Sequence, residues 1–592
     1  MGAEQFPGHG ERGARIEGDG ESHRTRTDAA PPACRQWPGP GGGPGGLPRR
    51  TGGQDDARLS ARTVHTRGHV VHCAPTMAST GRLSGLLLPL FSLRSKTDFG
   101  IGDFGGFDGL FQWMEAARQR LLMLLPLLPT SPGDPSPYST RSAFGLNALF
   151  INLESVPEFH ATGGEAALSD EEKRMLAEAR AAPRIRYDLV FRLKGAAFRR
   201  AFDHFDRTEW PHAPRAREFD TWRKQQGEWL ESYALYTAIS HERHQAPWWE
   251  WPEPLRNREP KALEAETARL EHEVRYHAWL QWVAEVQWNA VRERARARGV
   301  LLCGDEPFII GQDSSDVWAH PDILRRDARL GVPPDAFSAT GQDWGLPYFD
   351  FERMEKDDYR WLKSRAVKAA SYYDLRRVDH AVGYFRQWIR DEKTPTGRFI
   401  PDTEEAWKRY GEKNFRLLSK DAGIVAEDLG VIPPFVRAIL KDLGLPGYRV
   451  MRWERDDAVY RNPHEFPAVS LVTTGTHDTE PVADWWENAA SQEERLAIAR
   501  VYPEFQGLGV TKEFSPDIHR AMLAAALNAG SDLCVLPWQD VLGTRDRINL
   551  PGSMSDANWS YRMSQNVEDL LSTEETRKAA ERLGLLTASA RR

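Results

Sequence analysis

Residues 423–428 read Gly-Ile-Val-Ala-Glu-Asp, a short uninterrupted apolar run that ends in two acids. A strand that is buried on both faces, as in a parallel sheet, is apolar at successive positions and not only at alternate ones. The stretch therefore predicts a buried strand over residues 423–426. It places Glu427 at the carboxyl end of that strand.

Seven further runs of this kind are spread along the chain, and helical stretches separate most of them. With the first run, the predicted strands are residues 85–90, 121–125, 300–303, 376–378, 423–426, 448–451, 471–474 and 533–536. Apolar spacing predicts helices over 107–120 and over 433–443, the second opened by proline and followed by Gly444. Alternation of strand and helix favours a parallel sheet, and eight such units favour an α/β fold of the (β/α)8 TIM barrel type.

Two stretches between the predicted strands are much longer than a simple connection. Residues 155–299 are polar and helix-rich, and their last helix ends before Gly299, where a C-cap glycine belongs. We therefore expect a catalytic barrel over 77–592, with helix-rich insertions at about 155–299 and 306–370. No separate C-terminal β-domain is expected.

The first 76 residues differ in composition from the rest of the chain. They include the run Gly41-Gly42-Gly43-Pro44-Gly45-Gly46 and offer little to bury, which predicts a disordered leader over 1–76. The stretch has no apolar signal-peptide core and too many acids for a transit peptide. Because patterned sequence begins directly after Met77, we expect translation to start there. The intact mass of the natural protein tests this expectation.

Composition excludes several classes of partner. The 592 residues carry a formal net charge of -7, which disfavours binding to nucleic acid. The apolar run at 121–125 is far shorter than the roughly 20 residues of a membrane span. Four cysteines cannot form a disulfide framework and indicate a reducing compartment, so we expect a cytoplasmic protein. The oligomeric state is not predicted.

Acids stand near the carboxyl ends of four predicted strands: Asp305, Asp379, Glu427 and Asp478. All strands of a parallel barrel end on one face, so these four side chains would converge on one mouth. A lone acid is more often a surface residue or a helix cap. Four acids at similar positions are much less easily ascribed to coincidence.

The immediate neighbours of these acids suggest different roles for them. Arg377 and Asp379 lie two residues apart on one face of a strand, and a guanidinium favours the ionised carboxylate that a nucleophile requires. Asp428 follows Glu427, and we expect this like charge, with partial burial, to raise the pKa of Glu427 toward that of a general acid. A nucleophile and an acid/base are the equipment of a retaining glycoside enzyme.

Aromatic rings near such a mouth can stack on the faces of sugar rings. Tyr138, Trp344 and Trp318 are the candidates. Trp279 and Trp282 lie at helical spacing in the long helix before Gly299, and for them we expect packing instead.

Three segments carry the acids in a characteristic order: Arg377-Val378-Asp379-His380, Ala426-Glu427-Asp428-Leu429-Gly430 and Gly475-Thr476-His477-Asp478. Together they resemble the catalytic segments of the α-amylase superfamily. Further segments narrow the resemblance: residues 99–103, 136–144, 304–307, 313–318, 337–345 and 549–559. These are similar to the motifs of 4-α-glucanotransferases (amylomaltase, or disproportionating enzyme, of glycoside hydrolase family 77). The resemblance covers residues 82–565.

The resemblance implies transfer of an α-1,4-glucan segment from a donor malto-oligosaccharide to the 4-hydroxyl of an acceptor, by a retaining double displacement. By matching position, Asp379 would be the nucleophile that forms a covalent glucosyl-aspartate, Glu427 the acid/base and Asp478 the transition-state stabiliser. The remaining implied substrate-binding residues are Tyr138, Asp305, Trp344, Arg377, His380 and His477. The family uses no organic cofactor and no catalytic metal.

The chain departs from the family pattern at three places. Leu346 stands where the family usually has Asn, and Glu306 stands where an apolar residue is usual. Ala381-Val382-Gly383 replaces a frequent Phe-Arg-Gly. None of these changes removes a catalytic carboxylate.

Competing interpretations are weaker. Residues 100–105 satisfy Gly-x-Gly-x-x-Gly, but no strand directly precedes them and no acid follows at the spacing of a dinucleotide fold. His241 and His244 lack a third ligand for zinc. An amylase-type α-glucan hydrolase and a non-catalytic glucan-binding protein remain as alternatives. Incubation with maltotriose as the only substrate distinguishes a transferase from these two alternatives.

Overall fold

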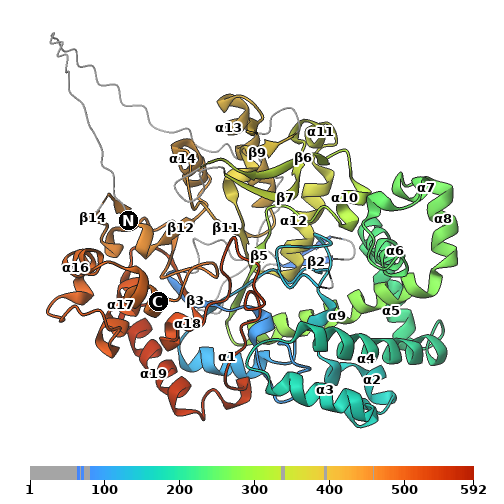
Figure 1. Cartoon of the computed structure of the whole chain (residues 1–592), viewed down its shortest axis with the longest axis horizontal. Coiled ribbons are helices and arrows are strands. Elements are labelled where there is room, and N and C mark those ends of the chain that lie inside the picture. Colours follow the sequence, from blue (N-terminus) through green and yellow to red (C-terminus); the bar gives the residue numbers. More distant parts are fainter. Residues whose placement is uncertain are drawn as a thin grey trace, which may run out of the picture. The chain divides into compact units, whose positions relative to one another are not determined.

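The computed structural model describes residues 63–66, 69–72, 81–131, 133–334, 341–391, 396–457 and 459–592. Its centre is a closed barrel of eight parallel strands (Figure 1). In order around the barrel these are β3 (Leu83–Leu87), β4 (Leu121–Leu124), β5 (Leu301–Glu306), β8 (Leu375–Val378), β11 (Gly423–Ala426), β12 (Gly447–Val450), β15 (Ser470–Thr473) and β16 (Leu533–Pro537). The predicted (β/α)8 barrel is confirmed, and each strand begins within two residues of its predicted start.

The strands are buried because helices and loops cover the outside of the barrel while side chains fill its inside. Leu86, Leu122 and Val425 are fully buried, as the uninterrupted apolar runs predict. Gly304 shows how closely the layers pack. A Cβ added at Gly304 would lie 2.3 Å from the ring of Tyr373, so only glycine fits at this point of β5.

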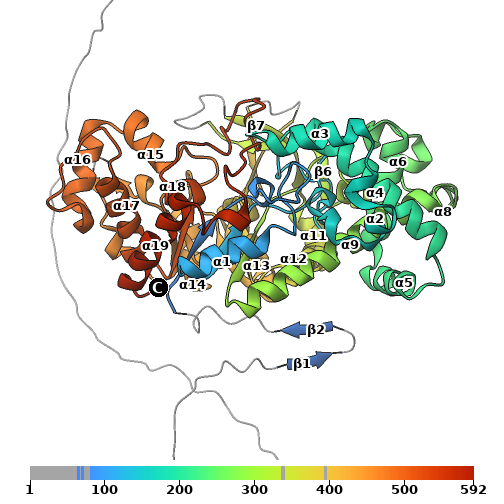
Figure 2. The same cartoon turned by 90° about the horizontal axis from the view of Figure 1, so that it is seen from below.

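The predicted helices lie between the strands. The first predicted helix is α1 (Phe107–Ala116), which packs beside α19 (Glu574–Ser589) in both views (Figures 1 and 2). The second is α14 (Pro434–Asp442), with Pro434 in its first turn and Gly444 just beyond its end at a φ of +69°. The remaining helices that follow β8 are α13 (Glu404–Leu418), α15 (Val482–Asp484), α16 (Gln492–Val501), α17 (Pro516–Asn528) and α18 (Trp538–Leu542).

A long helical segment connects β4 to β5. It contains α2 (Pro157–Ala161), α3 (Asp170–Ala181), α4 (Tyr187–Thr208), α5 (Pro214–Gln226), α6 (Glu228–Glu242), α7 (Glu253–Arg256), α8 (Pro260–Arg269) and α9 (Glu271–Ala297). Both views place α4, α5, α6 and α8 together at one side of the barrel (Figures 1 and 2). Trp279 and Trp282 of α9 are buried among Phe205, Phe219 and their neighbours. The prediction that these two rings pack is confirmed.

A small antiparallel sheet stands apart from the barrel strands, and the sequence did not predict it. Its order is β10 (Arg398–Ile400), β9 (Gln387–Arg390), β6 (Leu324–Val332) and β7 (Gln342–Phe349). Strands β6 and β7 lie between β5 and β8 in the chain, together with α10 (Ser315–Ala319), α11 (Phe351–Lys356) and α12 (Arg360–Tyr372). Two strands of two residues each, β13 (Arg455–Asp456) and β14 (Val459–Tyr460), follow β12 and pair with each other. Within residues 538–592 the structure has helices and no further strand.

The stretch expected to be a disordered leader contains one described element. β1 (Thr63–Thr66) pairs with β2 (His69–His72) in an antiparallel hairpin. The β-branched Thr63, Val64, Val70 and Val71 favour strands. The rest of the predicted leader, residues 1–62, 67–68 and 73–76, lies outside the described residues. No helix among the described residues is long and apolar enough to span a membrane.

Candidate active site

Arg377 joins two of the four strand-end acids. Its Nη1 donates to both carboxylate oxygens of Asp305, at 2.7 Å each, and to Oδ1 of Asp379 at 2.9 Å. Arg377 and Asp305 are buried, whereas Asp379 keeps 26% of its side chain exposed. Burial raises the pKa of Asp305, and the guanidinium of Arg377 opposes that rise. Asp379 is thus held by a buried cation and remains open to solvent.

Tyr138 connects Asp305 to the loop after β15. Its hydroxyl donates to Oδ2 of Asp305 at 2.7 Å and lies 3.0 Å from Nε2 of His477. The rings of Tyr138 and His477 are stacked, with centroids 5.2 Å apart. Burial would lower the pKa of His477, but the carboxylate of Asp478 outweighs this and raises it.

Asp478 is held in its ionised form. Its Oδ1 accepts from Nδ2 of Asn549 at 2.6 Å, and its Oδ2 lies 3.4 Å from Nε2 of His477. Burial would raise the pKa of Asp478, but His477 and the bond from Asn549 lower it to about 2. The side chain therefore carries a fixed negative charge at neutral pH.

Glu427, in contrast to Asp478, has a raised pKa. Its two carboxylate oxygens accept from the backbone N–H groups of His380 (2.8 Å) and Leu429 (3.0 Å). Burial raises its pKa to about 7, with a further rise from Asp379 and an opposing effect from Arg377. A carboxyl group with this pKa can both donate and accept a proton near neutral pH.

Of the two predicted causes of that shift, burial is the largest cause in the structure, but the like charge of Asp428 was wrong. Asp428 is buried and turned away from Glu427, with its carboxylate bonded to the N–H of Tyr448 (2.6 Å) and to Nε of Arg437 (3.0 Å). Consecutive residues of extended chain point to opposite faces, so two adjacent acids need not repel each other strongly. The like charge that acts on Glu427 comes from Asp379.

His380 and Trp344 lie together beside this group. His380 adopts a left-handed backbone with a φ of +44°, and its ring meets that of Trp344 edge-on at 4.9 Å. Burial lowers the pKa of His380 to about 4, so its imidazole is neutral at pH 7. Trp344 is only partly buried. Residues 335–340, which hold the first part of the predicted active-site loop, lie outside the described residues.

The structure removes Trp318 from the candidates for sugar stacking. Its side chain is fully buried in α10, with Nε1 donating to the carbonyl of Leu255 at 2.9 Å. It packs against Tyr236 and Trp251 of the helical segment. A ring without an exposed face cannot meet a sugar.

Glu306, one of the departures from the family pattern, faces away from the site. Its carboxylate pairs with Arg376 (3.0 Å) and Arg365 of α12 (3.2 Å), and all three side chains are buried. Asp305 and Glu306 are neighbours on β5 and point to opposite faces. The pairs Asp305–Arg377 and Glu306–Arg376 therefore tie the same two strands together, one on each face.

Two residues that contact the site were not predicted as site residues. Asn549 binds Asp478 from 71 residues further along the chain. The ring of Trp559 lies 5.7 Å from Tyr138 and 5.8 Å from His477. Both residues belong to a segment that resembles the family's motifs, and this was the signal that could have assigned them to the site.

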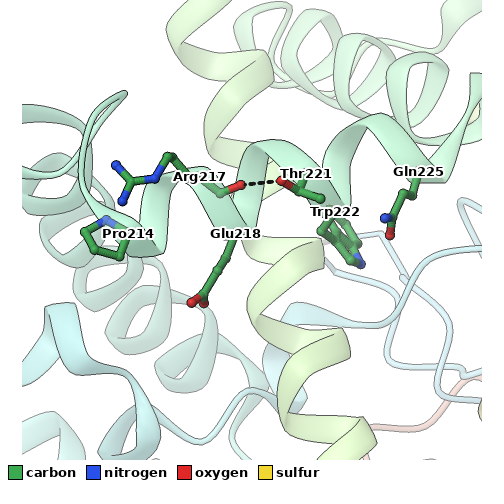
Figure 3. Close-up of a pocket in the computed structure, with 6 residues that line it drawn as sticks. All are labelled: Pro214, Arg217, Glu218, Thr221, Trp222 and Gln225. Atoms are coloured by element: carbon green, nitrogen blue, oxygen red, sulfur yellow. Dashed lines mark hydrogen bonds between the residues drawn. The ribbon is translucent and has the colours of Figure 1, made fainter. Parts of the chain in front are cut away.

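The barrel interior leaves little free space. Only about 10 Å³ of free space lies among Arg377, Tyr448, His477 and their neighbours, so the barrel interior is filled. A larger hollow of about 500 Å³ lies on α5, lined by Pro214, Arg217, Glu218, Thr221, Trp222 and Gln225 (Figure 3). None of the four strand-end acids lines that hollow. It is therefore no part of the candidate site.

Comparison with known proteins identifies the family. A family model described as 4-alpha-glucanotransferase matches residues 88–568. The chain belongs to this 4-alpha-glucanotransferase family. It is 33% identical over 509 residues to a 4-alpha-glucanotransferase of Chlamydia pneumoniae, covering 83% of this chain and 94% of that protein. It is 34% identical over 499 residues to that of Thermus thermophilus, covering 81% and 95%.

A solved structure of an amylomaltase agrees with this assignment. The amylomaltase from Streptococcus agalactiae in complex with acarbose superimposes with a TM-score of 0.73 at 26% identity, covering 86% of this chain and 99% of that one. The predicted family resemblance is confirmed. The chain is therefore an enzyme that transfers glucan segments, built on a (β/α)8 barrel.

Proposed function

We propose that the enzyme works by a retaining double displacement in which Asp379 is the nucleophile and Glu427 the acid/base. One observation carries this proposal: Arg377 holds the carboxylate of Asp379, while the pKa of nearby Glu427 is raised to about 7. One carboxylate is thus paired with a cation, and the other can carry a proton. A retaining mechanism needs such a pair.

In the first step Asp379 attacks the anomeric carbon of the donor glucan. The glycosidic bond breaks, and Glu427 gives its proton to the departing 4-oxygen. In the second step Glu427 takes the proton from the 4-hydroxyl of the acceptor, whose oxygen displaces Asp379. Each step inverts the anomeric carbon, so the α configuration is retained.

The surrounding residues stabilise and position the reacting sugar. Asp478, an anion down to a pH of about 2, would stabilise the positive charge on the ring in both transition states. The side chains proposed to hold the donor sugar and the nucleophile are Asp305, Arg377, His380 and His477. Tyr138 and Trp344 would offer ring faces to the glucan.

The proposed substrates are malto-oligosaccharides and longer α-1,4-glucans. The similarity to an amylomaltase that has been seen with acarbose supports a glucan-binding site. We also propose a cytoplasmic location, supported by Cys303 and Cys534, which are free buried thiols. The extent of the catalytic unit, residues 77–592 with insertions at about 155–299 and 306–370, also remains our proposal.

Incubation with maltotriose alone tests the function. Transfer between two maltotriose molecules yields glucose and longer oligosaccharides while the number of reducing ends stays constant. Chromatography of the products, with a reducing-end assay, measures both quantities. Glucose and maltose without longer products, accompanied by a rise in reducing ends, would show a hydrolase instead.

Removing only the hydroxyl of Tyr138 tests its part in the site. Tyr138→Phe keeps the ring but loses the hydrogen bonds to Asp305 and His477. Bonds to charged groups contribute about 1.5–3 kcal/mol each. We expect kcat/KM for maltotriose to fall about 10- to 100-fold, with little change in the thermal midpoint. A fall of less than twofold would remove the hydroxyl from the mechanism.

A further inference from the structure

Trp344 and Gly345 form a bulge in β7. Leu330 of β6 pairs with Leu346, but the next residue, Gly331, pairs with Asp343. Residues 344 and 345 therefore have no opposite partner on β6. Gly345 has a φ of +63°, in the left-handed region. Bulges of this kind re-aim a side chain, often beside an active site, and here the bulge places Trp344 against His380.

A bulge also frees backbone groups that the ladder would have paired. The carbonyl of Gly345 accepts from Nε2 of Gln312 at 2.6 Å, and its N–H donates to Oδ1 of Asp343 at 2.9 Å. Gln312 lies in the connection between β5 and α10, outside the small sheet. The bond from Gln312 thus joins the connection after β5 to the bulge of β7, directly after Trp344.

Gln312 is itself firmly held. Its Oε1 accepts from Nε of Arg326 on β6 at 3.2 Å, which turns the amide N–H₂ toward Gly345. The guanidinium of Arg326 lies 3.6 Å from the ring centre of Trp249 and 5.0 Å from that of Trp248. Nε1 of Trp248 donates to the carbonyl of Gln312 at 3.0 Å.

The next residue fixes the same segment to the helical segment before β5. The carboxylate of Asp313 accepts from Arg141 at 2.8 Å, from the hydroxyl of Tyr236 at 2.6 Å and from the N–H of Trp248 at 3.2 Å. Gln312 therefore connects a rigid part of the molecule to the backbone that carries Trp344. Among the described residues, an exposed hydrogen bond from Nε2 of Gln312 to the carbonyl of Gly345 makes this connection.

We infer that Gln312 is a positioning residue that holds Trp344 in place and thereby sets how often the glucosyl-enzyme reacts with a sugar acceptor and how often with water. This inference rests on the proposed double displacement. Trp344 is partly exposed beside His380, next in sequence to the nucleophile, where it can stack on an incoming sugar. When Trp344 is free to move, the sugar acceptor loses a stacking surface and reacts less readily. The reaction with water is unchanged, because water needs no stacking surface.

The test uses α-maltosyl fluoride as donor and glucose as acceptor with the full chain. Fluoride release measures donor turnover, maltotriose measures transfer to glucose, and maltose measures transfer to water. The variants are Gln312→Ala and Gln312→Glu, of which the second keeps a partner for Arg326 but cannot donate to Gly345. Gln226→Ala is the matched control, far along the chain from Trp344. It removes a side-chain hydrogen bond to the carbonyl of Trp222 on α5 and one accepted from Nζ of Lys368, as Gln312→Ala removes the bonds to Gly345 and Arg326.

We expect both Gln312 variants to need about three- to tenfold more glucose for half-maximal transfer, the range that one net hydrogen bond supports. The ratio of maltose to maltotriose among the products should rise by the same factor. The rate of fluoride release should stay within twofold of wild type, and the control should match wild type throughout. A merely structural role would lower the thermal midpoint and all rates together.

A double-mutant cycle with Trp344→Ala decides whether Gln312 acts through Trp344. If it does, adding Gln312→Ala to Trp344→Ala changes the partition no further, because the positioned group is already gone. Additive effects, or an unchanged partition in both Gln312 variants, would overturn the inference. A wild-type enzyme that forms only maltose would instead overturn the proposed function.

Discussion

Asp379→Asn is expected to lower kcat for maltotriose disproportionation on the order of 10⁶-fold, the loss that follows removal of a nucleophile from a covalent mechanism. Asparagine has nearly the same shape as aspartate but lacks the anionic oxygen that would form the ester. Arg377 would keep its two bonds to Asp305. The variant should therefore fold normally and still bind glucans.

Asp374→Asn is the matched control for this experiment. Asp374 directly precedes β8, whereas Asp379 follows the carboxyl end of the same strand. Its carboxylate accepts from the N–H of Leu302 at 3.0 Å and has no contact with the site acids. We expect the control to keep activity within a few-fold of wild type. Residual activity of Asp379→Asn above about 10⁻³ of wild type, far more than the expected loss would leave, would argue against Asp379 as the nucleophile.

The barrel was predictable because its strands are buried on both faces. Runs such as residues 121–125 and 423–426 are too short for a buried helix, and strands of a half-exposed sheet would alternate with polar residues. β6 and β7 belong to a sheet with partly exposed faces, and β6 contains Arg325, Arg326, Asp327 and Arg329. No uninterrupted apolar run marks such a strand, so the small sheet that carries Trp344 was missed.

The site was predictable to the extent that strand ends determine it. Asp305, Asp379, Glu427 and Asp478 each follow or end a barrel strand, so the topology alone brings them to one face. Asn549 binds Asp478 from a loop after the last strand, and only the folded chain shows that contact. The error over Trp318 has the same origin, since residue type does not reveal which rings the helical segment covers.

The behaviour of Asp428 shows where a local argument failed although the physical rule was known. Adjacent acids suggest repulsion, but alternation along extended chain turns Asp428 away from Glu427 and toward Arg437. The shift of Glu427 was predicted in the right direction for a partly wrong reason. Burial is its largest cause, and Asp379, 48 residues earlier in the chain, supplies the like charge.

Glu427→Gln is expected to lower kcat/KM for maltotriose by about 10²- to 10⁴-fold, the usual contribution of a general acid. The pH profile gives a sharper test. Glu427 must hold a proton in the free enzyme to begin the reaction, and its pKa is about 7. Wild-type kcat/KM should therefore fall about tenfold per pH unit above pH 7. Glutamine does not titrate, so this alkaline fall should disappear in the variant.

Glu454→Gln provides the control for that profile, because burial also raises the pKa of Glu454, which follows β12 but touches none of the four site acids. The control should keep the alkaline fall of the wild type.

A donor that needs no proton separates the two roles of Glu427. The leaving group of α-maltosyl fluoride departs without protonation, so Glu427→Gln should form the ester on Asp379 at nearly the wild-type rate. It should then release the sugar slowly, because no base activates the acceptor. Intact-mass measurement should show the enzyme with one added maltosyl group, and peptide mapping should place that group on Asp379. The variant could instead lose the same share of its activity on α-maltosyl fluoride as on maltotriose and accumulate no ester. Glu427 would then be a structural carboxylate, and another residue would be the acid/base.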